Sequence, residues 1–356
     1  YLVLTGGGLL VLLVDAMVRT LRKDHLNALN VLVLLATAIT VVAVRVEPGT
    51  YLSDAIAVNM FTRFFDLLLV GIGIVTTVYG SAVYARDGDY RPEFYPLVLF
   101  AVLGMMVLTA ASDLLMVFLG IETMSLAVYV LAAGRPGAEG RGSEGALKYL
   151  LLGSFASAFL LMGMALLYGY AGGTSFAALE AARAASTGPE LLFVAGLGLV
   201  LVGFSFKVAM VPFHMWTPDV YDGAPAHITG FMATAVKAAA FAALLRFVVV
   251  ALPGLADHWY GLISVLAVLT MTAGNLLALV QTSIKRMLAY SSIAHAGYLM
   301  LGVLAILAPG RGAAGTLTFE PGGVVEAAGS GVLFYLLGYS LMNLAAFGVI
   351  SQLGRT

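Results

Sequence analysis

The chain consists of long apolar runs separated by short polar connections, and the runs have the length that crosses a lipid bilayer. A spanning helix needs about 20 apolar residues. Counting on this basis predicts eleven spans, at residues 1–18, 26–46, 64–84, 94–111, 113–133, 146–170, 190–211, 225–251, 259–281, 287–308 and 328–352. The runs are continuous and do not alternate with polar residues, which argues against a β-barrel. The pattern predicts an all-α polytopic membrane protein with no soluble domain between its spans.

Composition supports this fold class and narrows the chemistry. Charged residues make up 10% of the chain and hydrophobic residues 61%, whereas soluble domains carry about 25% charged residues. A net charge of −1 lacks the excess of basic residues that is typical of nucleic-acid-binding proteins. The sequence has no cysteine and no nucleotide, flavin or haem motif. We therefore expect no cofactor, and any electron transfer that this protein serves takes place elsewhere.

Lysine and arginine placement predicts the orientation of the chain. If Tyr1 faces the outside, eleven basic residues lie in inward loops and four in outward loops, which fits the positive-inside rule. The chain starts at Tyr1 without Met, and we expect further residues at both ends. The two groups are Arg19, Arg22, Lys23, Arg86, Arg91, Arg135, Arg141, Lys148, Lys285, Arg286 and Arg355 on the inside, and Arg45, Arg63, Arg183 and Arg311 on the outside.

Three charged residues fall near the middle of predicted spans: Glu122, Lys207 and Lys237. A centred acidic or basic residue costs about 2.5–3.5 kcal/mol on an insertion scale, so each must face protein or water. Burial disfavours the charged form of a lysine, and a nearby carboxylate favours it. Glu122 beside Lys207 would thus be a proton switch, with Lys237 as the next acceptor. The alternative is a set of structural ion pairs that fix helix packing.

The helix that carries Lys207 is predicted to break beside it. Pro212 lacks an N–H group and its ring collides with the carbonyl of Val208, and Pro218 follows six residues later. Carbonyls freed near the bilayer midplane need water or side chains, which predicts a hydrated site next to Lys207. An ordinary proline kink is the alternative. His214 lies between the two prolines and could relay protons near neutral pH or cap the broken turn.

Further polar residues could extend a proton path. His227, Thr234 and Lys237 share one helix face, and the position of His227 near a helix start favours an interfacial residue over a member of this path. Lys148 and Lys285 open two spans and could guard an inner entrance or serve only as positive-inside anchors. Arg246 is expected to extend its side chain outward to the interface.

Three segments resemble the antiporter-like membrane subunits of respiratory complex I: "FLGIETMSLAVYVLAA" (118–133), "FKVAMVPFHMWTPDVYDGAPAHITGFMATAVKAAAF" (206–241) and "SIKRMLAYSSIAHAGY" (283–298). The stretches "GIETMSLAVYVL" and "LKYLLLGSF" are most similar to the N-type subunit. The resemblance implies an antiporter-like bundle with inverted five-helix repeats and a broken seventh helix. It divides the chain into three N-terminal helices (1–90), a first repeat (91–252) and the start of a second repeat (253–356), with a second broken helix expected after Thr356. The weak likeness between "LKYLLLGSF" and "LFYLLGYS" (333–340) fits such a repeat.

The resemblance also implies a function and roles. Glu122 corresponds to the helix-five carboxylate, Lys207 to the helix-seven lysine and Lys237 to the connecting lysine, and Lys285 matches a further lysine of the N-type pattern. The implied protein is a proton-translocating subunit of NADH:quinone oxidoreductase in the bacterial plasma (inner) membrane, without a redox centre. Its expected partners are neighbouring antiporter-like and small K-type subunits. The alternatives are a subunit of a Mrp-type sodium/proton antiporter or membrane-bound hydrogenase, and a scaffold whose buried charges only hold the arm together.

Overall fold

A computed structural model describes residues 1–17, 23–44, 46–134, 141–185, 188–251, 256–307 and 324–353. Several basic residues used for the orientation lie outside this range, namely Arg19, Arg22, Arg45, Arg135, Arg311 and Arg355. The placement of the N-terminus outside the membrane therefore stays a prediction.

The described chain is almost entirely helical. Its helices are α1 (Leu2–Met17), α2 (Lys23–Ala43), α3 (Met60–Asp87), α4 (Phe94–Ala110), α5 (Leu114–Ala132), α6 (Arg141–Ala171), α7 (Phe176–Ala185), α8 (Glu190–Val208), α9 (Thr217–Gly223), α10 (Ala226–Phe231), α11 (Lys237–Arg246), α12 (Ala256–Leu279), α13 (Ile284–Ile306) and α14 (Val324–Leu353). Two π-helical turns, η1 (Met232–Val236) and η2 (Phe247–Ala251), join and extend α10 and α11. Strands β1 (Gly49–Tyr51) and β2 (Ile56–Val58) form an antiparallel hairpin before α3.

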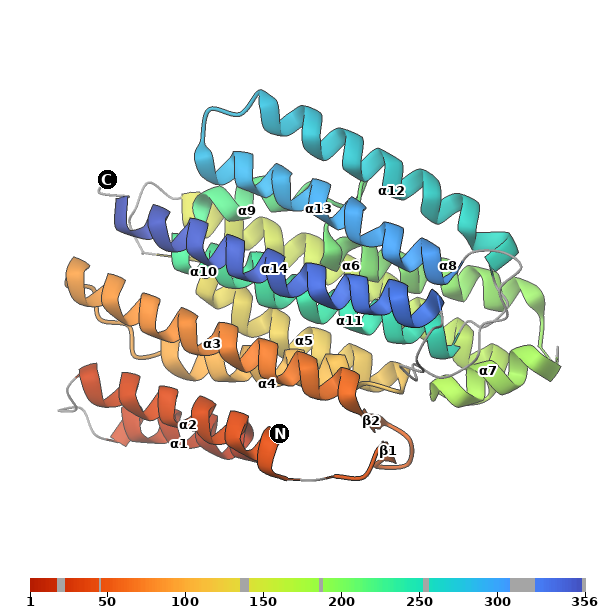
Figure 1. Ribbon diagram of the computed structural model, residues 1–356, viewed down its shortest axis with the longest axis horizontal. Coiled ribbons are helices and arrows are strands. Elements are labelled where there is room, and N and C mark those ends of the chain that lie inside the picture. The colour runs from red at the N-terminus through yellow and green to blue at the C-terminus, as the bar shows by residue number, and fades with distance from the viewer. Residues whose placement is uncertain are drawn as a thin grey trace.

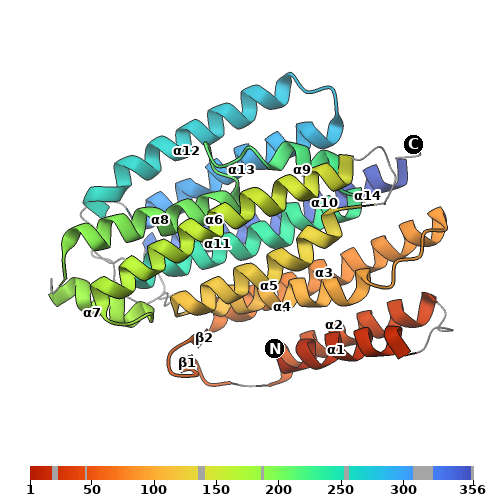
Figure 2. The same cartoon turned by 180° about the vertical axis from the view of Figure 1, so that it is seen from behind.

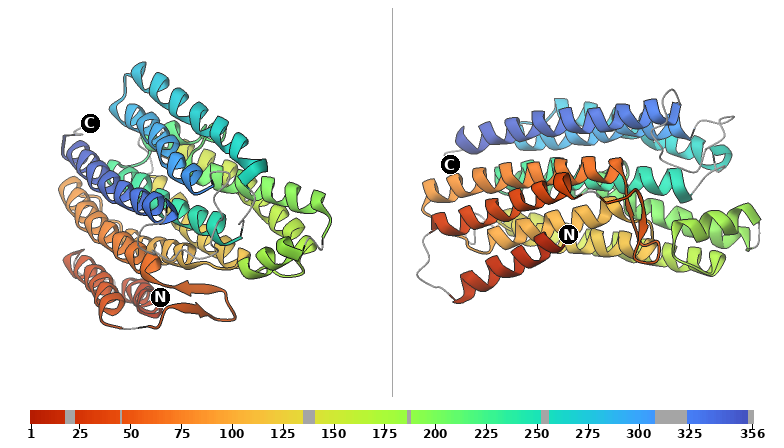
Figure 3. Two further views of the ribbon diagram at one scale, coloured as in Figure 1. Left: turned by 45° about the vertical axis from the view of Figure 1, so that its right-hand side comes forward. Right: turned by 60° about the horizontal axis from the view of Figure 1, so that its bottom comes forward.

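The long helices run side by side in one bundle, with α1 and α2 at one side and α12 and α13 at the other (Figures 1 and 2). The continuous helix Ala226–Val250 lies at the centre, since 94% of its most apolar stretch is buried, against 61% or less for the other candidate spans of the described chain. Figure 3 shows α3 and α14 beside it. This central helix carries Lys237, so the second lysine lies in the core of the bundle.

Each of the eleven predicted apolar runs contains a helix of the described chain. Nine helices of the described chain are long and apolar enough to cross a membrane, and two further apolar helices, Leu2–Met17 and Phe94–Ala110, are shorter. The antiporter-like helical bundle is confirmed, whereas the count of eleven spans stays a prediction. The sequence pattern missed α7, α9 and the β1–β2 hairpin, because it was read only for long apolar runs.

Close helix packing depends on glycine at particular crossings. A Cβ atom on Gly104 of α4 would lie 2.4 Å from the backbone nitrogen of Met124 in α5, and one on Gly120 would lie 2.7 Å from the backbone nitrogen of Leu108. The two backbones therefore approach at a distance that only glycine allows, as small residues permit in membrane helices. This crossing fixes α5, which carries Glu122, against α4.

The predicted break in the Lys207 helix is confirmed. Helix α8 ends at Val208, and Ala209 adopts a left-handed conformation with φ of 60°. Residues 211–216 form turns that lead into α9. The chain then reverses into the central helix, so the break and the second lysine belong to consecutive elements.

Candidate proton-transfer site

Lys207 occupies the last turn of α8 and is almost fully buried, with 3% of its surface exposed. Its Nζ atom donates a hydrogen bond of 2.7 Å to the Ser125 hydroxyl of α5. The same atom lies 5.5–5.7 Å from the ring centroids of Tyr129, Tyr149 and Phe206. Aromatic faces attract a cation through their quadrupole. One hydroxyl and three rings thus take the place of water around this ammonium group.

Glu122 acts on Lys207 without touching it. The Glu122 carboxylate is half-buried and accepts a short hydrogen bond from the Ser157 hydroxyl of α6. Ser125, which binds Lys207, follows three residues later on the same helix, about one turn away. The charge of Glu122 reaches the Lys207 ammonium electrostatically. The predicted Glu122–Lys207 relationship is therefore an interaction across Ser125, and not a direct ion pair.

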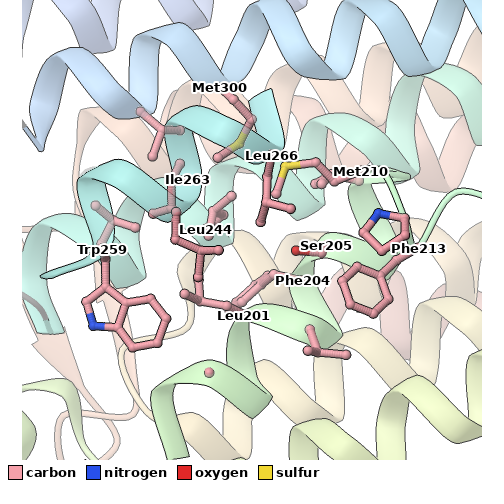
Figure 4. A pocket seen from close by; sticks show the side chains of 17 residues that line it. Leu201, Phe204, Ser205, Met210, Phe213, Leu244, Trp259, Ile263, Leu266 and Met300 are labelled. Carbon is pink, nitrogen blue, oxygen red and sulfur yellow. The ribbon is translucent and has the colours of Figure 1, made fainter. Parts of the chain in front are cut away.

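Protein N–H groups bind two of the carbonyls freed at the break. The Trp216 indole N–H donates to the carbonyl of Phe206 at 3.1 Å, and the Met210 N–H donates to the carbonyl of Ser205 at 2.8 Å. A cavity of about 270 Å³ adjoins the break between α8, α11 and α12 (Figure 4). Its lining is apolar apart from Ser205 and does not include Lys207. The hydrated site next to Lys207 stays a prediction, while the broken turn binds two of its own carbonyls.

Lys237 begins α11 directly after the π-helical turn η1 and is 3% exposed. Its Nζ atom donates to both the carbonyl and the hydroxyl of Ser292 in α13. The Tyr339 hydroxyl of α14 donates to the same Ser292 hydroxyl at 2.8 Å, and its ring centroid lies 5.6 Å from the Lys237 ammonium. The ring of His295 lies 5.0 Å from that of Tyr339. Ser292 and His295 of α13 and Tyr339 of α14 thus form a series of polar side chains that leads away from Lys237.

Helix α9 links the surroundings of the two lysines. The ring of Trp216, at the residue before α9, stacks on Tyr149 at 4.4 Å between centroids, and Tyr149 faces Lys207. Tyr221 of α9 packs against Trp216 with 6.3 Å between ring centroids, and Ser292 lies near enough to act on the Tyr221 hydroxyl electrostatically. Side chains in mutual contact therefore connect the Lys207 site with the serine that holds Lys237.

The supporting residues expected near the break do not contact either ammonium group. His214 is half-buried, and its Nδ1 atom has no hydrogen-bond partner among the described residues. Its backbone carbonyl accepts from the N–H of Thr217 at 3.0 Å. Pro212 is exposed and follows a cis peptide bond. Thr234 donates to the carbonyl of Gly230 in its own helix at 2.7 Å, and its place in a polar track towards Lys237 stays a prediction.

Two sequence expectations at the ends of the central helix are wrong. His227 is not interfacial, since it is 5% exposed and packs edge-on against the rings of Tyr84 and Phe94. Arg246 does not extend outward, because it is 2% exposed and donates to the Thr62 hydroxyl and the Thr109 carbonyl. Both errors arise because neighbouring helices cover this helix along its whole length.

Of the two lysines at predicted span starts, Lys148 belongs to an ionic network and Lys285 binds a backbone carbonyl near it. Lys148 contacts Glu144 at 2.8 Å and Asp219 at 2.7 Å, and Arg286 contacts the other Asp219 oxygen at 2.7 Å. Lys285 donates to the carbonyl of Ala224 at 2.9 Å. Burial alone would raise the pKa of the Asp219 carboxyl, but hydrogen bonds from Lys148 and Arg286 outweigh it and hold the pKa below its usual value. This network joins α6, α9 and α13 at the end of the bundle where α10 begins.

The sequence also matches known proteins. Residues 111–319 match the family described as "NADH:quinone oxidoreductase/Mrp antiporter, TM". The chain is 40% identical over 349 residues to NADH-quinone oxidoreductase subunit N of Trichlorobacter lovleyi, which covers 98% of this chain and 68% of that protein. The chain belongs to the NADH-quinone oxidoreductase subunit N family. It spans 58–68% of the length of the first three curated relatives that it matches.

Solved structures of this superfamily have the same architecture. A chain of respiratory complex I from Thermus thermophilus superposes with a TM-score of 0.77 at 36% identity, covering 98% of this chain and 70% of that chain. A chain of the Mrp complex from Dietzia sp. superposes with a TM-score of 0.76 at 23% identity, covering 98% and 63%. The second likeness shows a shared fold alone. The assignment of this chain to the subunit N family therefore rests on the sequence matches and on its likeness to the complex I chain.

The structure adds residues that the sequence did not single out. Ser125, Ser157 and Ser292 bind the three midplane charges, but serine is common in membrane helices and gives no signal of its own. Asp66 is 6% exposed inside α3. The predicted span began at residue 64, which placed Asp66 at the membrane edge, whereas α3 begins at Met60. A carboxylate within an apolar run was the signal that could have found it.

Proposed function

We propose that this chain is a proton-translocating membrane-arm subunit of an NADH:quinone oxidoreductase and that it has no redox centre of its own. One observation carries the proposal. Lys207 and Lys237 are both buried, each is held by a serine and by one or more aromatic rings, and α9 packs between their surroundings. Buried ionisable groups in spanning helices mark ion or proton pathways. The subunit N relatives support the assignment to this complex.

Protons move in this proposal by exchange between neutral and protonated amines. Lys207 holds a proton on Nζ against the Ser125 hydroxyl, and a change in the charge on Glu122 alters how strongly it is held. Release by Lys207 and uptake by Lys237 transfers one proton from the α8 site to the α11 site. His295 then lies next to the Lys237 site through Tyr339. The network of Lys148, Asp219 and Arg286 would regulate entry from the inner surface.

The same proposal places the chain in a bacterial inner membrane, in contact with neighbouring antiporter-like and small K-type subunits. Its segments would be the N-terminal helices 1–90, the repeat 91–252 and the partial inverted repeat 253–356. A second candidate is a subunit of a Mrp-type antiporter, which the family description and the shared fold of the Mrp complex favour. Sodium dependence of proton movement in vesicles separates this candidate, because an oxidoreductase subunit moves protons without sodium.

The test is proton translocation per electron in membrane vesicles that contain the assembled complex. Lys207→Ala and Lys237→Ala should each lower the proton-to-electron ratio while NADH oxidation continues. Arg183→Ala is the control, since Arg183 pairs with the largely exposed Glu190 at the start of α8. Full pumping in both lysine variants would leave only the scaffold interpretation.

A further inference from the structure

Asp66 is a second buried acid, remote from Glu122 in the fold. It lies on α3 with 6% of its surface exposed, and its Oδ1 atom has no hydrogen-bond partner among the described residues. The hydroxyl of Tyr1 is also buried and without a partner there, and the charge of Asp66 reaches it. A buried polar atom without a partner costs about 1–3 kcal/mol. A proton on Asp66 would remove the cost of its buried, unpartnered charge.

The cation beside Asp66 is fixed by neutral groups. Arg246 of the central helix donates to the Thr62 hydroxyl at 2.7 Å and to the Thr109 carbonyl at 3.1 Å, and its guanidinium lies 5.1 Å from the centre of the Phe61 ring. Thr62 precedes Asp66 by one turn of α3. Arg246 therefore acts on Asp66 through its charge without forming an ion pair within 4.0 Å in the described structure. The carboxyl can gain or lose a proton without breaking a salt bridge.

The site lies at the end of the bundle opposite the Lys148–Asp219–Arg286 network. Helix α3 begins directly after the β1–β2 hairpin, and the Thr62 hydroxyl donates to the carbonyl of Ala57 in β2 at 2.8 Å. Figure 1 shows this hairpin and α9 at opposite ends of the molecule. Arg246 follows Lys237 by nine residues on the central helix, a rise of about 13.5 Å. Asp66 thus lies beyond Lys237 in the direction of the far membrane surface.

We propose that Asp66 is a further proton-binding residue, whose carboxylate takes up a proton and returns it to water at the hairpin end of the bundle. Uptake forms an O–H bond on Asp66 and neutralises its charge, and release breaks that bond and restores the carboxylate beside Arg246. The charged and titratable groups that act on it are the amino group and the hydroxyl of Tyr1, directly before α1, and the Arg246 guanidinium of α11. The proposal rests on the proposed proton-translocating function.

Infrared difference spectroscopy tests the proposal independently of pumping. Spectra of the purified assembled complex at acidic and alkaline pH should contain a protonated-carboxyl band that disappears in Asp66→Asn and returns, shifted in frequency, in Asp66→Glu. Asp54→Asn is the control, because Asp54 is exposed in the hairpin turn at the same end. If Asp66→Asn does not assemble, the shifted band in Asp66→Glu carries the test. A carboxyl spectrum that neither variant changes overturns the proposal.

Proton pumping provides the second measurement. Asp66→Asn should lower the proton-to-electron ratio with NADH oxidation retained, and Asp66→Glu should recover most of it. If Lys207→Ala lowers the ratio and Asp66→Asn does not, this inference fails while the proposed function stands. If neither variant changes the ratio, both fail.

Discussion

Lys207 donates its hydrogen bond to Ser125, at 2.7 Å, and not to Glu122, which precedes Ser125 by one turn of α5. The lysine and the carboxylate are thus coupled through space, while each keeps its own serine partner on a neighbouring helix. A change in the charge of Glu122 can therefore alter the proton affinity of Lys207 without any hydrogen bond to the lysine being broken.

Ser125→Ala removes the hydroxyl that accepts from Lys207. A hydrogen bond to a charged group contributes about 1.5–3 kcal/mol, so the protonated form of Lys207 should be destabilised by that amount. We expect the proton-to-electron ratio to fall while NADH oxidation continues, measured in vesicles. Ser154→Ala is the matched control, since Ser154 is exposed and bonds only the carbonyl of its own helix. Equal pumping in the two variants would contradict the role of Ser125.

The two tryptophans of the chain allow a paired test of the broken helix. Trp216→Phe removes the indole N–H that binds the carbonyl of Phe206, which keeps its bond from the Ala209 N–H, so the loss should cost about 0.5–1.5 kcal/mol of stability. Trp259→Phe is the control, because the buried Nε1 atom of Trp259 has no partner among the described residues. Thermal unfolding in detergent measures both. A larger loss in Trp259→Phe than in Trp216→Phe would refute the capping role.

Asp219 gives a pH-dependent contribution whose sign follows from its lowered pKa. A carboxyl with a depressed folded-state pKa stabilises the protein above its unfolded pKa of about 3.9, and this stabilisation is lost as the pH falls through the folded-state value. Asp219→Asn should therefore lower thermal stability at neutral pH and make little difference well below pH 4. The loss should be about 1 kcal/mol or less, since the side chain is 35% exposed and its charges are screened. A deficit that persists undiminished in acid would disprove this assignment.

Helix packing at the α4–α5 crossing is tested by Gly104→Ala. The added methyl group would lie 2.4 Å from the Met124 backbone nitrogen, and overpacking of this kind costs about 1–3 kcal/mol. Gly71→Ala on α3 is the control, because nothing lies within 4 Å of the added atom. Alanine also favours helix over glycine by about 1 kcal/mol. Gly71→Ala should therefore melt at the same or a higher temperature, and Gly104→Ala at a lower one.

Much of the fold was predictable because a bilayer constrains the chain strongly. Runs of about 20 apolar residues can only be helices in lipid, so Ala226–Val250 and its neighbours were found from hydropathy alone. Pro212 and Pro218 likewise located the break after Val208. Short elements such as α7 and α9 have no comparable signal, since seven to ten residues neither cross a membrane nor show a decisive period.

The charged residues of the candidate site could be predicted from the sequence, but the side chains that bind them could not. Glu122, Lys207 and Lys237 were visible because charge is rare inside apolar runs. Their serine partners and the connection through Tyr221 depend on which helices become neighbours, and one sequence does not determine that. Arg246 was misjudged because it lies near a span end, where such a side chain normally reaches water, whereas here Thr62 and Thr109 bind it inside the bundle.

Proton translocation per electron in a Glu122→Gln complex tests the central claim most directly. Glutamine keeps the size of the side chain and its ability to accept from Ser157, and it removes the charge that acts on Lys207. The account predicts a lower proton-to-electron ratio with NADH oxidation retained. An unchanged ratio would contradict it.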